Sequence, residues 1–203
     1  MKPVRAAVFL LSCACAALAD LTEVEPGLRL IGIHEMDTES REIAAALATS
    51  PNLILDLRDA RGSMQAAVQL EALLAQSKQG TTRYLLLNGD TSTAVTARLP
   101  FTGPGLVVLA PAQDKLRVDV PVSTSVADDR AAVNALRAGA NPLTLLQSSE
   151  PKRRDDEAAL SAAPAAEPPQ TPTPHASKST PTDIVLSRAV QIHHGWTAIR
   201  ANL

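Results

Sequence analysis

The apolar residues of this chain form short runs that alternate with stretches of helical periodicity. Four runs have the length of a strand and few polar interruptions: residues 28–34, 53–57, 84–87 and 106–110. Between them, three stretches favour helices: residues 37–48, 64–75 and 91–99. Apolar runs without polar alternation are typical of parallel strands that are covered on both faces. The alternation therefore predicts an α/β domain with a parallel sheet, flanking helices and right-handed crossovers.

Two further elements extend this domain toward residue 146. Residues 116–122 resemble another strand, and residues 127–138 another helix. Asp37 or Thr38 is expected to cap the helix that runs to residue 48, because their side chains can accept a hydrogen bond from a first-turn N–H group. We therefore expect one folded domain over residues 20–146.

The composition changes sharply after this domain. Residues 147–181 hold seven of the 15 prolines, together with many Ala, Ser and Thr residues, which predicts a disordered linker. Residues 182–203 then show apolar positions at alternating spacings of four and three, which predicts an amphipathic helix with Asp183 as its N-cap and Gly195 as a weak point.

This C-terminal helix has more than one possible partner. An amphipathic helix buries its apolar face, either against the domain that precedes it or against a second copy of the chain. Its polar face is not markedly basic, which argues against a helix that lies on a membrane surface. We expect it to dock on the core or to self-associate.

The first 19 residues have the pattern of an export signal. Lys2 and Arg5 precede an apolar run over residues 6–16, and small residues lead to Asp20. The pattern predicts a periplasmic or extracellular protein. In a rival interpretation Cys13 is the lipidated residue of a lipoprotein, which would tether the chain to a membrane. Cys13 and Cys15 both lie in the signal, so cleavage after Ala19 would exclude disulfides, thiol nucleophiles and thiolate-bound metals.

Charge and residue patterning exclude several other classes. Loss of Lys2 and Arg5 with the signal would change the formal charge from −2 to −4, which does not suggest a nucleic-acid partner. No other apolar stretch approaches the roughly 18 residues needed to span a bilayer. His193 and His194 are neighbours that point to different faces of a helix, so we expect no metal and no cofactor.

Three segments carry a resemblance to a known family. Residues 52–63 read NLILDLRDARGS and residues 85–94 read LLLNGDTSTA, each an apolar run followed by a Gly-containing turn. They resemble the signatures DLRxNxGG and NGxTASASE of the C-terminal processing (tail-specific) peptidases, which have the crotonase/Clp-like fold. Residues 107–115 also keep the two valines, the proline and the lysine of the family segment VVGEPTxGK at matching offsets. The resemblance covers about residues 27–145.

The resemblance implies a catalytic site for hydrolysis of peptide bonds. Thr93 takes the position of the serine nucleophile, with Ser92 as the adjacent hydroxyl, and Lys115 takes the position of the general base. The backbone N–H groups of Gly62 and Ala94 would form the oxyanion hole, which stabilises the charge that develops on the carbonyl oxygen. In the same family pattern, Asp56 and Arg58 brace the loop after their strand.

The chain departs from the family at positions that matter for catalysis. The Thr93 methyl group stiffens χ1 and crowds the hydroxyl, and the interval from Thr93 to Lys115 is a few residues short. Ser63 replaces the second glycine of the turn. Two functions therefore stay open: an exported serine-type peptidase, and a non-catalytic binding or scaffolding module of the cell envelope. Either would engage a protein or peptide.

One geometric criterion separates these two functions. A Lys115 ammonium group within hydrogen-bond reach of the Thr93 or Ser92 hydroxyl favours catalysis, whereas an exposed Lys115 favours the binding module. We expect His34, at the end of the first strand, to be a buried and hydrogen-bonded residue rather than a catalytic base.

Overall fold

The structure, a computed structural model, describes residues 21–76, 78, 80–146 and 181–202. The predicted export signal and all but the last residue of the predicted linker lie outside these ranges. Among the described residues, no helix combines the length and hydropathy that a membrane crossing requires.

The central feature of the domain is a six-stranded sheet in which the strands lie in sequence order. Its strands are β1 (Thr22–Glu25), β2 (Leu28–Gly32), β3 (Asn52–Asp56), β4 (Thr82–Leu86), β5 (Leu106–Pro111) and β6 (Val120–Val122). β1 and β2 form an antiparallel pair at one edge, and the remaining neighbours are parallel. The predicted α/β class with a mostly parallel sheet is thus confirmed, and β3, β4 and β5 are adjacent as expected.

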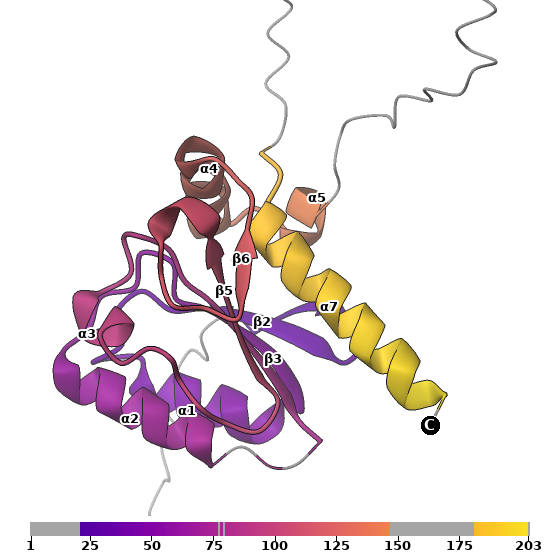
Figure 1. The fold of residues 1–203 in the computed structure, drawn as a ribbon, viewed down its shortest axis with the longest axis horizontal. Coiled ribbons are helices and arrows are strands. Elements are labelled where there is room, and N and C mark those ends of the chain that lie inside the picture. Colours follow the sequence, from indigo (N-terminus) through magenta and orange to yellow (C-terminus); the bar gives the residue numbers. More distant parts are fainter. Residues whose placement is uncertain (1–20, 77, 79, 147–180, 203) are drawn as a thin grey trace, which may run out of the picture.

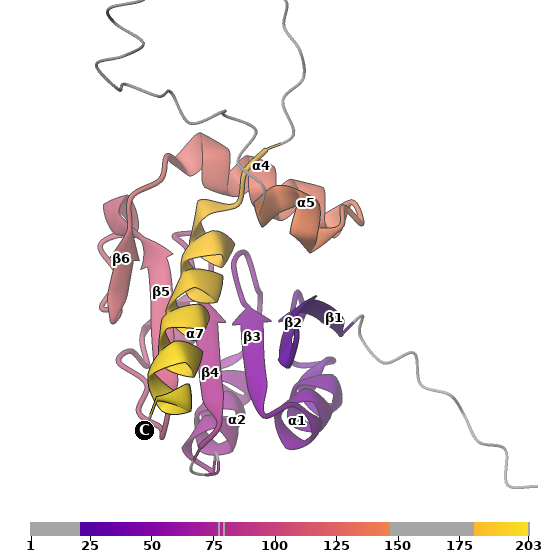
Figure 2. The same cartoon turned by 90° about the vertical axis from the view of Figure 1, so that its right-hand side faces the viewer.

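Helices cover the two faces of the sheet unequally. α1 (Ser40–Thr49), α2 (Met64–Ala75) and the short α3 (Thr93–Thr96) follow β2, β3 and β4 and lie together on one face (Figure 1). α7 (Ile184–Ala201) lies on the opposite face, while α4 (Val126–Arg137) and α5 (Pro142–Leu146) lie beyond the carboxyl ends of the strands (Figure 2). The chain thereby builds one apolar core on each side of the sheet.

Several element boundaries differ from the sequence-based expectation, those of α1, β6 and α3 among them. α1 begins at Ser40 after Glu39, and Asp37 does not cap it but accepts hydrogen bonds from the backbone and hydroxyl of Ser63. β6 is shorter than residues 116–122, because the carboxylate of Asp119 binds the Val108 N–H and replaces a ladder hydrogen bond. α3 spans only four residues, since Pro100 disfavours helical geometry at the residue before it.

The C-terminal helix docks on the core, which is one of the two arrangements left open by the sequence. Its buried residues Val185, Leu186, Ala189 and Val190 pack in the same cluster as Tyr84 and its neighbours on β2–β6. Asp183 is the N-cap, as predicted, and its side chain accepts a hydrogen bond of 2.9 Å from the Leu186 N–H. The helix runs unbroken through Gly195. The buried residues of α7 all precede this glycine, which is itself exposed.

The packing of α7 predicts an unusual titration of Tyr84, the single tyrosine of the chain. Burial against this helix raises the pKa of its phenol to about 12, although the charge of Arg200 opposes the shift. Ultraviolet titration of the native chain should therefore show phenolate formation near pH 12. The denatured chain serves as the control and should titrate near pH ~10.

The direction of the Tyr84 pKa shift also determines how the stability of the fold changes with pH. Because the pKa of Tyr84 is higher in the folded chain, the stabilisation is complete below the unfolded pKa and is lost as the pH rises through the folded pKa. A native chain whose Tyr84 titrates like the denatured one would contradict this packing.

Candidate functional site

The turn after β3 and the start of α3 meet at the carboxyl end of the sheet. The Ser92 N–H donates to the Ala60 carbonyl over 2.8 Å, and the Ser92 hydroxyl donates to the Gly62 carbonyl over 3.0 Å. Ligand sites of parallel α/β sheets usually lie at this end. The fold thus brings together two of the three motif segments.

One of the two backbone N–H groups expected to form the oxyanion hole, that of Ala94, has a structural partner. The Ala94 N–H donates to the Ser92 hydroxyl oxygen over 3.3 Å, so Ser92 acts as the N-cap of α3. At Gly62 an added Cβ would lie 3.0 Å from Cβ of Met36, which explains why the turn has a glycine there. Both positions are therefore accounted for by local packing and capping.

The expected nucleophile, Thr93, and the expected base, Lys115, are not hydrogen-bonded to each other. Thr93 is the first residue of α3 and its side chain is exposed. Lys115 follows a single 3₁₀ turn (Ala112–Asp114), has a left-handed backbone with φ 54° and is also exposed. In the described part of the chain, the Lys115 ammonium makes no hydrogen bond or ion pair with Thr93 or Ser92. Its neighbour Asp114 instead accepts a hydrogen bond of 2.7 Å from the Gly89 N–H.

A buried ion-pair network lies beside this turn and centres on Arg58. Its guanidinium is 0% exposed and contacts the carboxylates of Asp56, Asp129 and Asp183 at 2.6, 3.1 and 2.7 Å. Five hydrogen bonds link these side chains, so every N–H of the guanidinium has an acceptor. The expected bracing role of Asp56 and Arg58 is confirmed, and it extends to α4 through Asp129 and to α7 through Asp183.

The network carries more negative than positive charge. Burial tends to lower the pKa of Arg58, but the charges of Asp56 and Asp183 outweigh it and hold this pKa well above its usual value. Burial also raises the pKa of Asp129, although Arg58 and the Asn88 amide oppose the shift. Arg58 therefore stays charged, and Asp129 is protonated more readily than an ordinary aspartate.

Asn88, the asparagine of the Asn-Gly motif, connects this network to the turn. Its amide donates to Asp59 and Asp129 over 2.9 and 3.1 Å, and its carbonyl accepts from the Asp59 and Asp90 N–H groups. Asp59 has a left-handed backbone with φ 60°, which these bonds hold in place. The sequence pointed to Asn88 only as part of a motif, and it pointed to Asp183 only as a helix cap.

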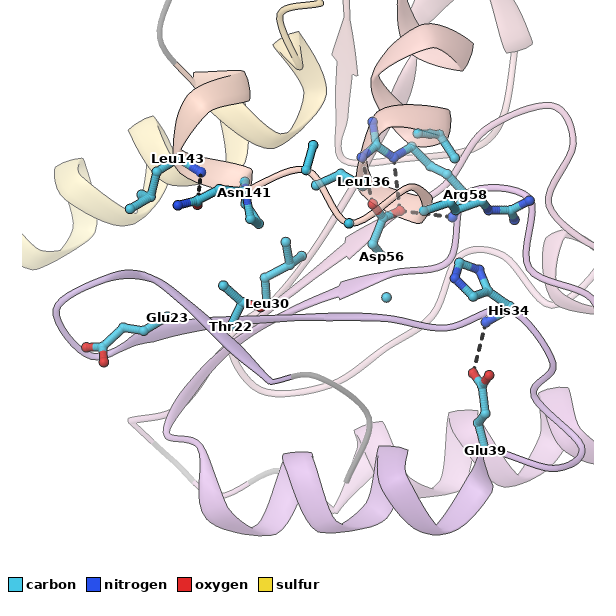
Figure 3. A pocket seen from close by; sticks show the side chains of 16 residues that line it. Thr22, Glu23, Leu30, His34, Glu39, Asp56, Arg58, Leu136, Asn141 and Leu143 are labelled. Atoms are coloured by element: carbon cyan, nitrogen blue, oxygen red, sulfur yellow. Dashed lines mark hydrogen bonds and ion pairs between the residues drawn. The ribbon is translucent and has the colours of Figure 1, made fainter. Parts of the chain in front are cut away.

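A cavity of about 560 Å³ opens next to the network. Figure 3 shows Asp56 and Arg58 at one end of it and Asn141 and Leu143 at the other. β2 and β3 form its floor, and α4, α5 and the loop between them form the opposite wall. Its volume lies in the range of pockets that bind small molecules or single side chains.

His34 lines this cavity and differs from its expected placement. It is exposed rather than buried, and its backbone N–H, not its ring, binds the Glu39 carboxylate over 2.9 Å. The reason is that β2 ends at Gly32, so the chain has left the sheet before His34. Asn88 and Asp129 line a separate small cavity of about 170 Å³ beside Gly89.

The two C-terminal histidines have separate partners. His193 is buried with its Nδ1 3.4 Å from the Tyr84 hydroxyl, and His194 pairs with Glu25. Within the described ranges, no group of three or more histidine, aspartate or glutamate side chains is placed to hold a metal ion.

Comparisons with known proteins add no support to the resemblance carried by the motifs. No protein-family model matches the sequence, and a search of curated proteins returned no match. The relation to tail-specific peptidases therefore stays a prediction from the three motif segments.

Proposed function

We propose that this chain is an exported, non-catalytic binding module derived from the tail-specific peptidases and sharing their crotonase/Clp-like fold. The exposed side chain of Lys115, which has no contact with Ser92 or Thr93 in the described part of the chain, carries this proposal. The meeting of the Gly62 turn with the start of α3 supports the relation to the family.

A working dyad requires a lysine that has lost its charge. An ammonium group in water has a pKa near ~10.4 and becomes a base at neutral pH only when burial or a nearby cation lowers that value. The Lys115 side chain is exposed, so the burial that a lysine base needs is not present there.

The hydroxyl of Ser92, the neighbour of the expected nucleophile Thr93, is also committed to the fold. Ser92 donates its only hydroxyl proton to the Gly62 carbonyl and accepts from the Ala94 N–H. An oxyanion hole needs the Ala94 N–H free for the substrate, so this bond would have to break before catalysis by either hydroxyl. Catalysis by Ser92 would also require its proton to turn from Gly62 toward a base. Both requirements favour a binding role.

The rigid carboxyl end of the sheet is the surface that such a module would present. The Arg58 network fixes the turn after β3, and the cavity of about 560 Å³ lies directly beside it. We propose that a protein or peptide partner binds there. Pre-organised surfaces lose little conformational entropy on binding, which supports affinity.

The test of this proposal is a combined binding and hydrolysis experiment on residues 20–203. We expect an unstructured polypeptide to stay intact and to shift the NMR signals of Gly32, His34 and Asn141, which line the cavity. Thr93→Ser, which removes the crowding methyl group, should remain equally inactive, because the lysine is still out of place.

Two variants make the outcome decisive. If the parent cleaves the polypeptide and both Lys115→Ala and Thr93→Ala abolish cleavage, the chain is a peptidase and the proposal is wrong. Cleavage that persists in Lys115→Ala would point to a contaminating enzyme. Intact polypeptide without any signal change at the cavity would remove the support for a binding role there.

A further inference from the structure

Two arginines are buried among the described residues, and their surroundings differ in a way that points to a second binding site. Arg58 has three carboxylates around it and no free N–H. Arg83, in β4, is only 3% exposed, and no carboxylate among the described residues lies within ion-pair distance of it. A buried cation normally has an anionic partner, because removing a charge from water is costly.

One end of the Arg83 guanidinium is held firmly by backbone carbonyls. Nη1 donates to the carbonyls of Pro51 and Thr82 over 2.7 and 3.5 Å, and Nη2 donates to the Leu47 carbonyl over 2.8 Å. Leu47 belongs to the last turn of α1, whose final carbonyls lack partners within the helix. Capping of α1 through Leu47 therefore uses one of the five N–H groups of Arg83, and the carbonyls of Pro51 and Thr82 use two more.

The remaining edge of the guanidinium is unused. Nε has no acceptor although it is buried, and Nη2 has a second hydrogen beyond the one given to Leu47. The adjacent Ser50, 1% exposed, also has a buried hydroxyl without a partner. Unpaired buried donors are rare in folded proteins, and each costs stability unless a ligand or water satisfies it.

Ser50 and Arg83, whose unpaired Oγ and Nε atoms are themselves buried, line one cavity of about 410 Å³ between the C-terminal ends of α1 and α2. Its charged residues are Lys78 and Arg83, and none of the described residues that line it is acidic. Leu47, Leu73 and Ala48 add an apolar wall. Burial also lowers the pKa of Arg83, and no nearby anion offsets this shift. The cavity thus combines two cations, an unused hydroxyl and an apolar surface.

We propose that this cavity binds an organic carboxylate, which would accept hydrogen bonds from Nε and Nη2 of Arg83 and place its apolar chain against Leu47 and Leu73. Arginine pairs with carboxylates through two parallel N–H bonds, and its free edge has the two donors that this geometry needs. The site lies at the amino ends of β3 and β4, opposite the cavity beside Arg58, so it is independent of the function proposed above.

Titration of residues 20–203 with hexanoate, hexylamine and inorganic phosphate tests this site, with calorimetry and NMR as readouts. Hexanoate should bind and shift the signals of Ser50 and Arg83, and hexylamine should not bind. Phosphate distinguishes a general oxyanion site from one that also uses the apolar wall, since it should bind more weakly than hexanoate.

Three variants complete the experiment. Arg83→Met should weaken hexanoate binding by about tenfold to a hundredfold, the range of one or two charge-assisted hydrogen bonds. Ala48→Trp fills the cavity from the exposed surface of α1 and should also prevent binding, and it decides the matter if Arg83→Met does not fold. Arg29→Met removes an exposed arginine of strand β2 that does not line this cavity, and the variant should bind like the parent. Equal binding of hexanoate and hexylamine, unchanged affinity in Ala48→Trp, or no hexanoate binding by the parent would overturn the proposal.

Discussion

Replacement of Arg58 by methionine is expected to lower the free energy of unfolding by about 3–5 kcal/mol, the usual cost of removing one partner from a buried ion pair. Methionine keeps much of the volume of the side chain but leaves Asp56, Asp129 and Asp183 buried without their cation. Since small domains are stable by only ~5–15 kcal/mol, the variant should lose a large part of its stability. Urea denaturation followed by circular dichroism measures the change.

The matched control for this variant is Arg188→Met, which removes an exposed arginine of α7. We expect its free energy of unfolding to stay within about 0.5 kcal/mol of the parent, as for most surface substitutions. Similar losses in both variants would show that Arg58 does not hold the fold through its carboxylates.

The loss in Arg58→Met should also depend on pH. Burial already raises the pKa of Asp129, and loss of the Arg58 guanidinium removes the charge that most opposes this shift. A group with a raised folded pKa stabilises the fold below its unfolded pKa and loses that contribution as the pH rises. The difference between parent and variant should therefore be largest at neutral pH and smaller in acid.

Replacement of Gly105 by alanine is the second large effect that we expect. Its backbone has φ +66°, and an added Cβ would lie 2.1 Å from the Thr81 carbonyl oxygen. The left-handed conformation and the steric overlap should together cost about 2–4 kcal/mol. Relaxation is difficult because the Gly105 carbonyl accepts the Arg83 N–H at the start of the β4–β5 pairing.

Gly139→Ala separates the cost of the left-handed backbone from the cost of the steric overlap. Gly139 has φ +84°, but nothing lies within 4 Å of its added Cβ, so only the backbone conformation is penalised. We expect a loss of about 1 kcal/mol in the same denaturation measurement. Equal losses in Gly105→Ala and Gly139→Ala would mean that the contact with Thr81 relaxes freely.

The buried network also explains how the C-terminal helix α7 is held against the sheet. Asp183 caps α7 and binds Arg58, from which it is separated by 125 positions in the sequence. Its backbone N–H further donates to the Leu145 carbonyl of α5. Asp183 thus fixes the start of α7 and also ties that end of the helix to Arg58 and to α5.

Features that depend on neighbouring residues could be predicted from the sequence. The apolar runs of β3, β4 and β5 indicated buried parallel strands, and helix α2 spans the predicted residues 64–75 because its periodicity and its Ser63 cap are local signals. The same holds for Asp183, whose position before an amphipathic stretch is typical of an N-cap.

Which distant groups meet depends on the tertiary fold. The motif offsets placed Thr93 and Lys115 in one site, but both are exposed and no hydrogen bond joins them in the described part of the chain. Asp129 and Asp183 join Arg58, whereas Arg83 has no carboxylate partner among the described residues, and no periodicity distinguishes these two arginines. Burial and pairing of charges are long-range properties, because they depend on how the sheet, α4 and α7 pack together rather than on the sequence around each charge.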